Sequence, residues 1–188
     1  MTQATFRPDS LDVRSFAQNA AQLSGTLSLS KLERLTQDLY AQNADFSLKT
    51  LHWNAFGKSI AVTGGVAQSW LQLEIEASVP LQCQRCLQAM EAGIELSRNF
   101  RFVRDEDEAE RQDDESEEDL LVASKQFNLM ELIEDELILA LPFAPTHEVC
   151  PVPVKLQNSS ADFEAALNEK PKAFAALGEL KLTKKVSS

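Results

Sequence analysis

The sequence predicts an α+β fold: a mainly antiparallel β-sheet built on a long hairpin at about 69–104 and covered by two or three helices. Residues 71–81 alternate between apolar and polar side chains, and residues 94–102 largely do the same, as strands with one buried face do. Residues 128–141 carry the longest apolar stripe at helical spacing in the chain, and residues 30–41 carry a shorter one. We expect these apolar faces to pack into one core.

The segment before the hairpin supplies the early elements. Residues 25–29 favour a short extended piece, and Ser30 with Glu33 predicts a capping box that opens a helix over 30–41. Between residues 46 and 56 the apolar positions change phase, which predicts a strand containing a β-bulge. Gly64 and Gly65 predict the turn that leads into the hairpin.

The helix at 128–141 has clear start and stop signals. Asn128 is a favoured capping residue, and Glu131 stands three positions later, where its side chain can return to the cap amide. Pro142 ends the helix because its ring blocks the next backbone hydrogen bond. The acidic residues of this helix are expected on its solvent-facing side; they are Glu131, Glu134, Asp135 and Glu136.

The acidity of the chain is concentrated in one segment. Residues 105–119 hold eleven acidic residues and one arginine, whereas the rest of the chain holds 18 acidic and 17 basic residues. With no large apolar side chain, this segment is predicted to be a mobile loop. It could solvate the protein, attract a basic partner such as a ribosomal protein, or bind cations. The remaining body is nearly neutral, which gives no electrostatic reason to expect nucleic-acid binding.

Length and hydropathy bound the organisation of the protein. A chain of 188 residues fits a single domain, 1–188, with the mobile acidic loop 105–119 and a short basic C-terminal segment, 172–188. No apolar run has the length of a membrane span, and the polar N-terminus lacks the pattern of a signal peptide. We therefore expect a cytoplasmic protein without membrane contact. The sequence leaves the oligomeric state open.

The cysteines form a candidate metal site. Cys83 and Cys86 form a Cys-x2-Cys pair at the expected hairpin tip, and His147 and Cys150 follow the proline that ends the long helix. Four such ligands suit a tetrahedral structural zinc ion if the two pairs meet. The alternative is that the cysteines are small buried side chains and that His147 lies on the surface. A thioredoxin-type redox motif is less favoured, because these cysteines follow a strand and precede no clear helix.

Three stretches together resemble one known family. They are LQCQRCL at 81–87, EDELILALPFAPTHEVC at 134–150 and KAFAALGELKLTKK at 172–185. In this order they are similar to the YceD family, the large ribosomal RNA subunit accumulation proteins of bacteria and plastids. The resemblance implies a role in the synthesis, processing or stability of 23S ribosomal RNA. It supplies no catalytic residues.

Among function classes, a non-enzymatic factor in large-subunit ribosome biogenesis fits best. The chain has two histidines, and it lacks a glycine-rich phosphate loop and a nucleophile elbow. We expect it to act through ribosome-assembly or rRNA-processing proteins. The alternative is direct binding of 23S rRNA by the basic C-terminal segment and the hairpin tip. The candidate contacts to RNA or a partner are Arg85, Lys181, Lys184 and Lys185.

Overall fold

The computed structural model describes residues 6–41, 45–153, 160, 162 and 163. By internal contacts the chain divides into two units, Met1–Pro151 and Val152–Ser188, and the fold below is that of the first. That residues 1–188 form one domain stays a prediction. The elements are α1 (Val13–Gln18), β1 (Gln22–Ser28), the 3-10 turn η1 (Leu29–Lys31), α2 (Glu33–Asp38), β2 (Thr50–Ile60), β3 (Gln68–Gln82), β4 (Ala89–Val103), α3 (Glu106–Asp113), β5 (Asp119–Val122) and α4 (Leu129–Leu139).

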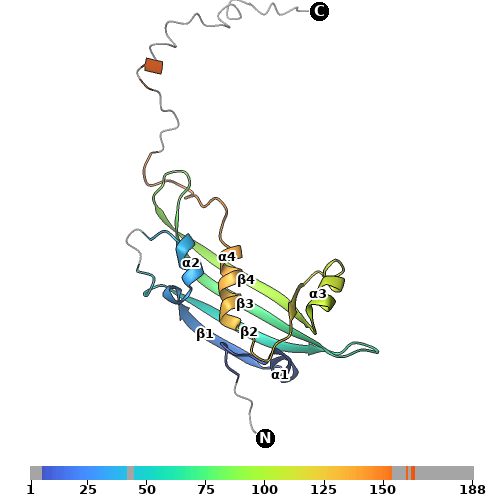
Figure 1. Ribbon diagram of the computed structural model, residues 1–188. Helices are drawn as coiled ribbons and strands as arrows, with labels where there is room; N and C mark the ends of the chain where they lie inside the picture. Colours follow the sequence, from blue (N-terminus) through green and yellow to red (C-terminus); the bar gives the residue numbers. More distant parts are fainter. Residues whose placement is uncertain (1–5, 42–44, 154–159, 161, 164–188) are drawn as a thin grey trace, which may run out of the picture. The chain divides into compact units, whose positions relative to one another are not determined.

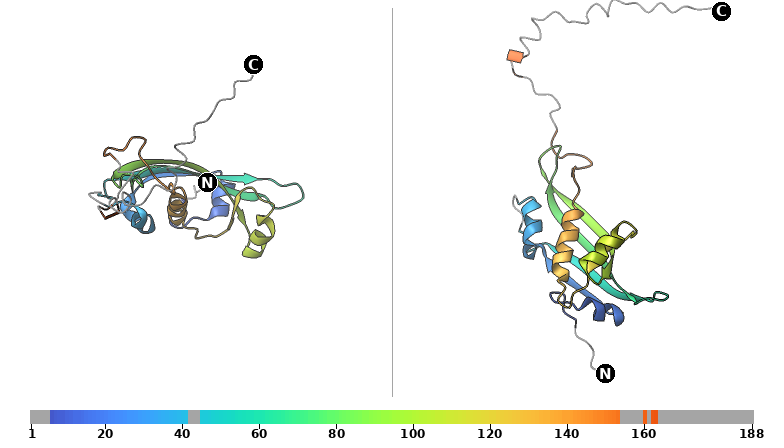
Figure 2. Two further views of the ribbon diagram at one scale, coloured as in Figure 1. Left: turned by 90° about the horizontal axis from the view of Figure 1, so that it is seen from above. Right: turned by 45° about the vertical axis from the view of Figure 1, so that its right-hand side comes forward.

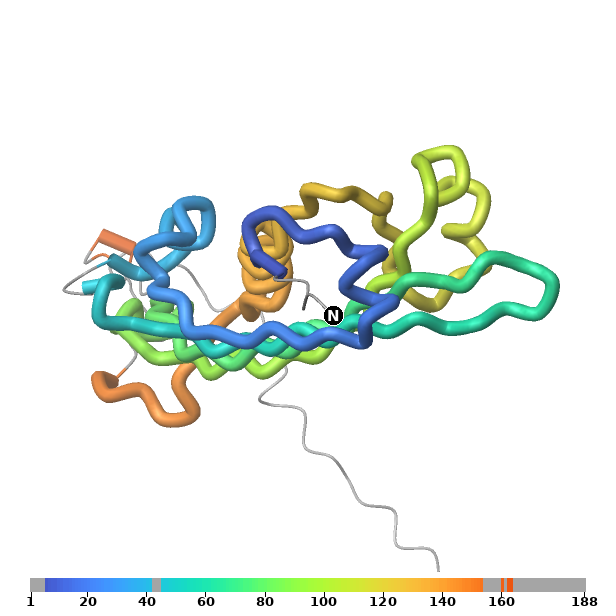
Figure 3. The backbone as a smooth tube through the Cα atoms, turned by 90° about the horizontal axis from the view of Figure 1, so that it is seen from below, coloured from blue at the N-terminus to red at the C-terminus, as the bar shows by residue number. Residues whose placement is uncertain are grey.

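The strands form one sheet in the order β1-β2-β3-β4-β5 (Figure 1). Successive strands from β1 to β4 pair antiparallel, and β5 pairs parallel with β4. Seen edge-on, the sheet has its helices on one face only (Figures 2 and 3). The prediction of an α+β fold with a long antiparallel hairpin is confirmed.

The core lies between the sheet and the helices. The alternating apolar residues of β3 point into it, and they meet the apolar stripe of α4 and the buried leucines of η1 and α2. Among the residues that are almost fully buried are Phe16, Leu35, Leu51, Leu71, Leu73, Phe100, Leu129, Ile133 and Leu137. No helix in the described part of the chain is both long and apolar enough to cross a membrane. That the protein is cytoplasmic stays a prediction.

Two local expectations are wrong. The predicted bulge is absent from the pairing of β2 with β3, which runs without interruption from Leu51 to Ile60. The change of apolar phase arises because the strand begins only at Thr50, so residues 46–48 precede it. The helix over 30–41 is also shorter than expected: it is split into η1 and α2, and no side chain at the cap position Leu32 closes the start of α2.

The acidic segment is not wholly a loop, because residues 106–113 form α3. Asp105 caps this helix by accepting a hydrogen bond from the backbone amide of Glu108 at 2.9 Å. Three acidic residues in the first turn and Arg111 in the last suit the helix dipole, so the charges that suggested a loop favour a helix here. None of the residues of α3 is buried. The mobility of the segment stays a prediction.

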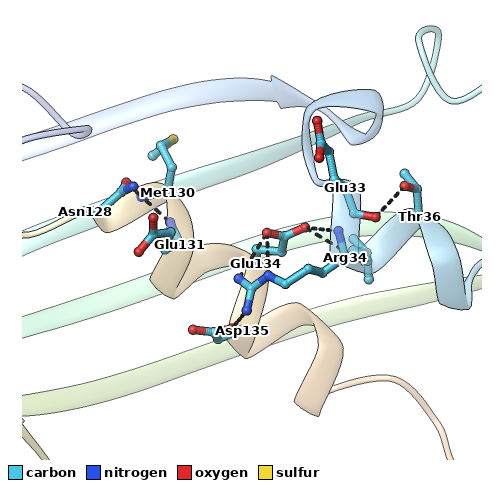
Figure 4. A network of polar contacts seen from close by, with 9 residues as sticks. Glu33, Arg34, Thr36, Asn128, Met130, Glu131, Glu134 and Asp135 are labelled. Atoms are coloured by element: carbon cyan, nitrogen blue, oxygen red, sulfur yellow. Dashed lines mark hydrogen bonds and ion pairs between the residues drawn. The ribbon is translucent and has the colours of Figure 1, made fainter.

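The N-terminus of α2 is capped by a residue far away in the sequence. Glu134 of α4 accepts hydrogen bonds from the backbone amides of Arg34 at 2.8 Å and Leu35 at 3.1 Å (Figure 4). Its carboxylate also pairs with the Arg34 guanidinium at 3.0 Å. Glu134 and Glu136 are 8% and 7% exposed, so the expectation that they face solvent is wrong. The reason is that α2 lies beside α4 on the same face of the sheet and covers Glu134, while Glu136 lies on the side of α4 that is next to Arg98 of β4.

Gly57 marks a close approach between β2 and α1. A Cβ atom there would lie 2.6 Å from the carbonyl oxygen of Phe16, a backbone atom that cannot turn away. We expect Gly57→Ala to lower the free energy of unfolding by about 3 kcal/mol, the upper range for overpacking. Chemical denaturation measures it. Gly93→Ala is the matched control, since a Cβ at Gly93 in β4 meets nothing within 4 Å. Equal stability of the two variants would contradict the close approach.

We expect Glu136 to make the stability of the protein depend on pH. Burial raises the pKa of its carboxyl, although Arg98, 3.4 Å away, favours the charged form. A raised pKa in the folded state means that folding favours the protonated form, so this group's contribution is fully present in acid and is lost as pH rises through the folded pKa. Glu136→Gln should therefore raise the melting temperature at pH 7, and this gain should shrink as the pH falls through the raised folded pKa and be gone below about pH 4.

The control for this prediction is Glu131→Gln, which removes the same charge from the exposed side of α4. A calorimetric pH series on both variants separates a local effect from the change in net charge. A lower melting temperature for Glu136→Gln at pH 7 would show instead that the pair with Arg98 outweighs the cost of burial.

Candidate metal centre

The tip of the β3–β4 hairpin forms a tight turn that presents two cysteines. The backbone amide of Cys83 donates to the carbonyl of Gln88 at 3.0 Å, and the amide of Leu87 donates to the carbonyl of Cys83 at 2.8 Å. Leu87 has a positive φ of 60°, an uncommon conformation for a branched side chain, which reverses the chain directly after Cys86. The turn therefore brings Cys83 and Cys86 side by side.

The segment that follows α4 returns to this tip. Three prolines at positions 142, 145 and 151 limit its conformations. The amide of Gln84 donates to the carbonyl of Pro145 at 2.8 Å, and the amide of His147 donates to Cys83 Sγ at 3.4 Å. These bonds place His147 and Cys150 beside the cysteine turn.

The four candidate ligands converge. One ligand atom from each of Cys83, Cys86, His147 and Cys150 lies within 4.8 Å of the others. Cys83 Sγ is 4.0 Å from Cys150 Sγ, and Cys86 Sγ is 3.4 Å from His147 Nδ1. A tetrahedral zinc ion holds sulfur and nitrogen ligands about 3.5–3.8 Å from one another. The spacing is therefore close to that of a tetrahedral metal site, and the three cysteines are free thiols.

The histidine is oriented for coordination through Nδ1. Its Nε2 lies 3.1 Å from the carbonyl oxygen of Ala89, the first residue of β4. A proton on Nε2 satisfies that carbonyl and leaves the Nδ1 lone pair directed at Cys86. Such a hydrogen bond from the outer nitrogen fixes the ring and raises its basicity as a ligand.

The thiols differ in acidity. Burial opposes ionisation of Cys83, but backbone amides of His147, Cys86 and Arg85 donate to its sulfur and bring its pKa down to about 5. The pKa of Cys86 is raised, first by burial and then by the neighbouring cysteines. At neutral pH this lowered pKa favours the thiolate form of Cys83. Ionisation of a second cysteine beside it would create electrostatic repulsion, which a bound cation would offset.

Arg85 is the residue whose role the sequence did not reveal. Its Nε donates to Cys150 Sγ at 3.1 Å, and its Nη2 donates to the carbonyl oxygen of His147 at 2.5 Å. The guanidinium thereby holds the returning segment against the turn and supplies positive charge beside a cysteine. A cation between two metal-binding cysteines is the signal that could have suggested this role. Lys181, Lys184 and Lys185 lie outside the described residues.

The convergence of Cys-x2-Cys and His-x2-Cys defines the class: an α+β protein with a candidate metal centre at a hairpin tip. The family model of the large ribosomal RNA subunit accumulation protein YceD matches residues 71–181, which include the whole centre. The chain belongs to the YceD family. It is similar to the large ribosomal RNA subunit accumulation protein YceD of Haemophilus influenzae, with 28% identity over 176 residues, covering 93% of this chain and 95% of that protein. No solved structure matches the chain.

Proposed function

We propose that this protein is a non-enzymatic factor in the synthesis, processing or stability of 23S ribosomal RNA and that it acts through protein partners. The observation that carries the proposal is the family match, whose printed name refers to accumulation of the large ribosomal RNA subunit. The match covers more than half of the chain and includes the hairpin from residue 71 onward, α4 and the candidate metal centre.

The distribution of charge supports a protein partner over naked RNA. Many described cations are already paired with acids of the same chain, among them Arg34, Lys49 and Arg98. In contrast, α3 and the residues after it expose a dense group of carboxylates. Such a segment repels phosphate and attracts the basic surfaces of ribosomal proteins.

The centre at the hairpin tip is proposed to hold a structural zinc ion. Four protein ligands complete a tetrahedron and leave no open position for a substrate, which is the arrangement of structural rather than catalytic zinc. Three thiolates, one neutral imidazole and Zn²⁺ carry a net charge of −1, and the Arg85 guanidinium at Cys150 Sγ balances it. The ion would join the returning segment 142–151 to the hairpin.

Complementation of cells that lack this protein tests the function. A plasmid-borne copy should restore the ratio of 23S to 16S rRNA. A variant whose acidic residues at 105–119 are replaced by their amides should fail to restore it, while a control that shuffles residues 114–118 keeps the charge and should succeed. Full restoration by the neutralised variant would contradict an acidic docking segment, and an unchanged ratio in the deleted cells would contradict the family role.

Direct RNA binding is the competing outcome. Filter binding of the purified protein to 23S rRNA fragments across a salt series distinguishes it, because each phosphate contact steepens the salt dependence. Tight binding with a steep slope, lost on deletion of residues 181–185, would overturn the preference for a protein partner. Weak binding that is insensitive to this deletion is the expected result.

A further inference from the structure

Strand β1 forms one edge of the sheet, and its outer side is open in the described part of the chain. β1 pairs only with β2, and no other described element is bonded along its far side (Figure 1). Two backbone hydrogen bonds flank the pairing of β1 with β2 and show which residues of β1 bond to β2. The amide of Gly57 donates to the carbonyl of Ala21, and the amide of Leu29 donates to the carbonyl of Lys49. Odd-numbered residues of β1 therefore direct their backbone groups at β2, and the even-numbered ones direct theirs outward.

This edge lacks the usual features that prevent strand pairing. The strand reads QLSGTLS, without a charged residue or a proline, and its register with β2 contains no bulge. Edge strands of monomers are usually protected by lysine, proline or a bulge. On the helix-covered face, Leu23 and Leu27 are only half buried and pack at the margin of the core. An added strand would cover both leucines.

We propose that two copies of this chain pair through β1, antiparallel about a two-fold axis at Gly25, so that their sheets become one continuous sheet. The strand is complementary to itself in this register. Ser24 pairs with Thr26 of the second copy through outward backbone groups, and Leu23 lies opposite Leu27 of the second copy on the core side.

Gly25 suits the position on the axis. Opposed residues that do not exchange hydrogen bonds approach to about 4.5 Å between Cα atoms, and glycine leaves this space free. Its own core-side space is already taken, because a Cβ there would lie 2.9 Å from Trp53 Cζ2. A shift of the register by two residues keeps the same backbone hydrogen-bonding pattern but separates Leu23 from Leu27. One of these leucines would then lie opposite Gly25, and the other opposite a residue outside the strand. The register centred on Gly25 therefore buries the most apolar surface.

The strand is short, so the dimer should be reversible. A seven-residue strand pair buries less than a standard stable interface, and we expect a dissociation constant in the micromolar range. The inference is independent of the rRNA role and of the metal, because neither the acidic segment nor the hairpin tip takes part.

Sedimentation velocity over about 1–300 μM protein tests the dimer, a range that spans the affinity expected of a small interface. Wild type should shift from monomer to dimer. Ser24→Lys/Thr26→Lys and Ser24→Glu/Thr26→Glu each oppose like charges across the axis and should remain monomeric at every concentration. An equimolar mixture of the two should recover the dimer, with one copy of each.

Thermal unfolding of each variant checks that the fold persists, since the altered side chains lie on the open face of the sheet. Thr26→Pro is a second probe: it removes an outward amide that the β2 ladder does not use, and it should also yield a monomer. A wild-type protein that stays monomeric throughout would overturn the proposal. Dimers that persist in both charged variants, or a mixture that fails to dimerise, would overturn it equally.

Discussion

Replacing Cys83 by serine is expected to abolish the proposed zinc binding at the hairpin tip and to lower the melting temperature by about 10 °C or more. The free energy of metal binding contributes to folding where the site exists only in the folded chain. At about 2–4 °C per kcal/mol for a protein of this size, a loss of several kcal/mol gives such a shift. Cys83 is the buried ligand of the four, and it accepts hydrogen bonds from the turn and from His147, so serine also leaves these donors with a poorer acceptor.

Differential scanning calorimetry with and without a zinc chelator measures this effect. The chelator should lower the melting temperature of wild type and leave that of Cys83→Ser unchanged. Gln84→Ser changes an exposed side chain in the same turn and should behave like wild type. If the chelator leaves the melting temperature of wild type unchanged, the four candidate ligands keep their geometry without a metal, and the proposal of a structural zinc ion is contradicted.

Glu134→Ala is expected to lower the free energy of unfolding by about 3–4 kcal/mol. The carboxylate accepts from two backbone amides at the start of α2 and from the Arg34 side chain, and it is almost fully buried. Its removal leaves those amides without an acceptor in a place where water has little access. Chemical denaturation measures this loss of unfolding free energy. A metal content equal to that of wild type would show that the loss arises from the contact between α4 and α2 and not from the hairpin tip.

Asp135→Ala is the matched control for Glu134→Ala. Asp135 pairs with the same arginine at 2.5 Å, but both side chains are about half exposed there, and such surface pairs contribute about 1 kcal/mol or less. Equal losses in the two variants would mean that the cap on α2 adds nothing beyond the ion pair with Arg34.

The β3–β4 hairpin could be predicted because its information is local. Strict alternation from Leu71 to Leu81 fixes which side of the strand is buried, and the structure buries those residues. The start and stop of α4 were likewise encoded by Asn128, whose side chain accepts from the amides of Met130 and Glu131, and by Pro142. The Cys83–Cys86 pair and the His147–Cys150 pair are each recognisable as a motif in the sequence, although only the fold brings the two pairs together.

The features that escaped prediction depend on contacts between distant segments. The sequence places Glu134 on the solvent-facing side of a helix, because nothing near it in the sequence indicates that α2 lies against that side. The sequence therefore predicts Ser30 as the cap of this helix, whereas the cap of α2 comes from a residue one hundred positions away. Helix α3 was missed for a different reason: charge density outweighed the local capping signal of Asp105.

Native mass spectrometry of the protein purified without chelator tests the central claim, that the hairpin tip and the segment after α4 are joined by one metal ion. The predicted result is a mass higher than that of the bare chain by one zinc ion, absent from Cys83→Ser. A metal-free mass for a wild-type protein with a cooperative unfolding transition would contradict it.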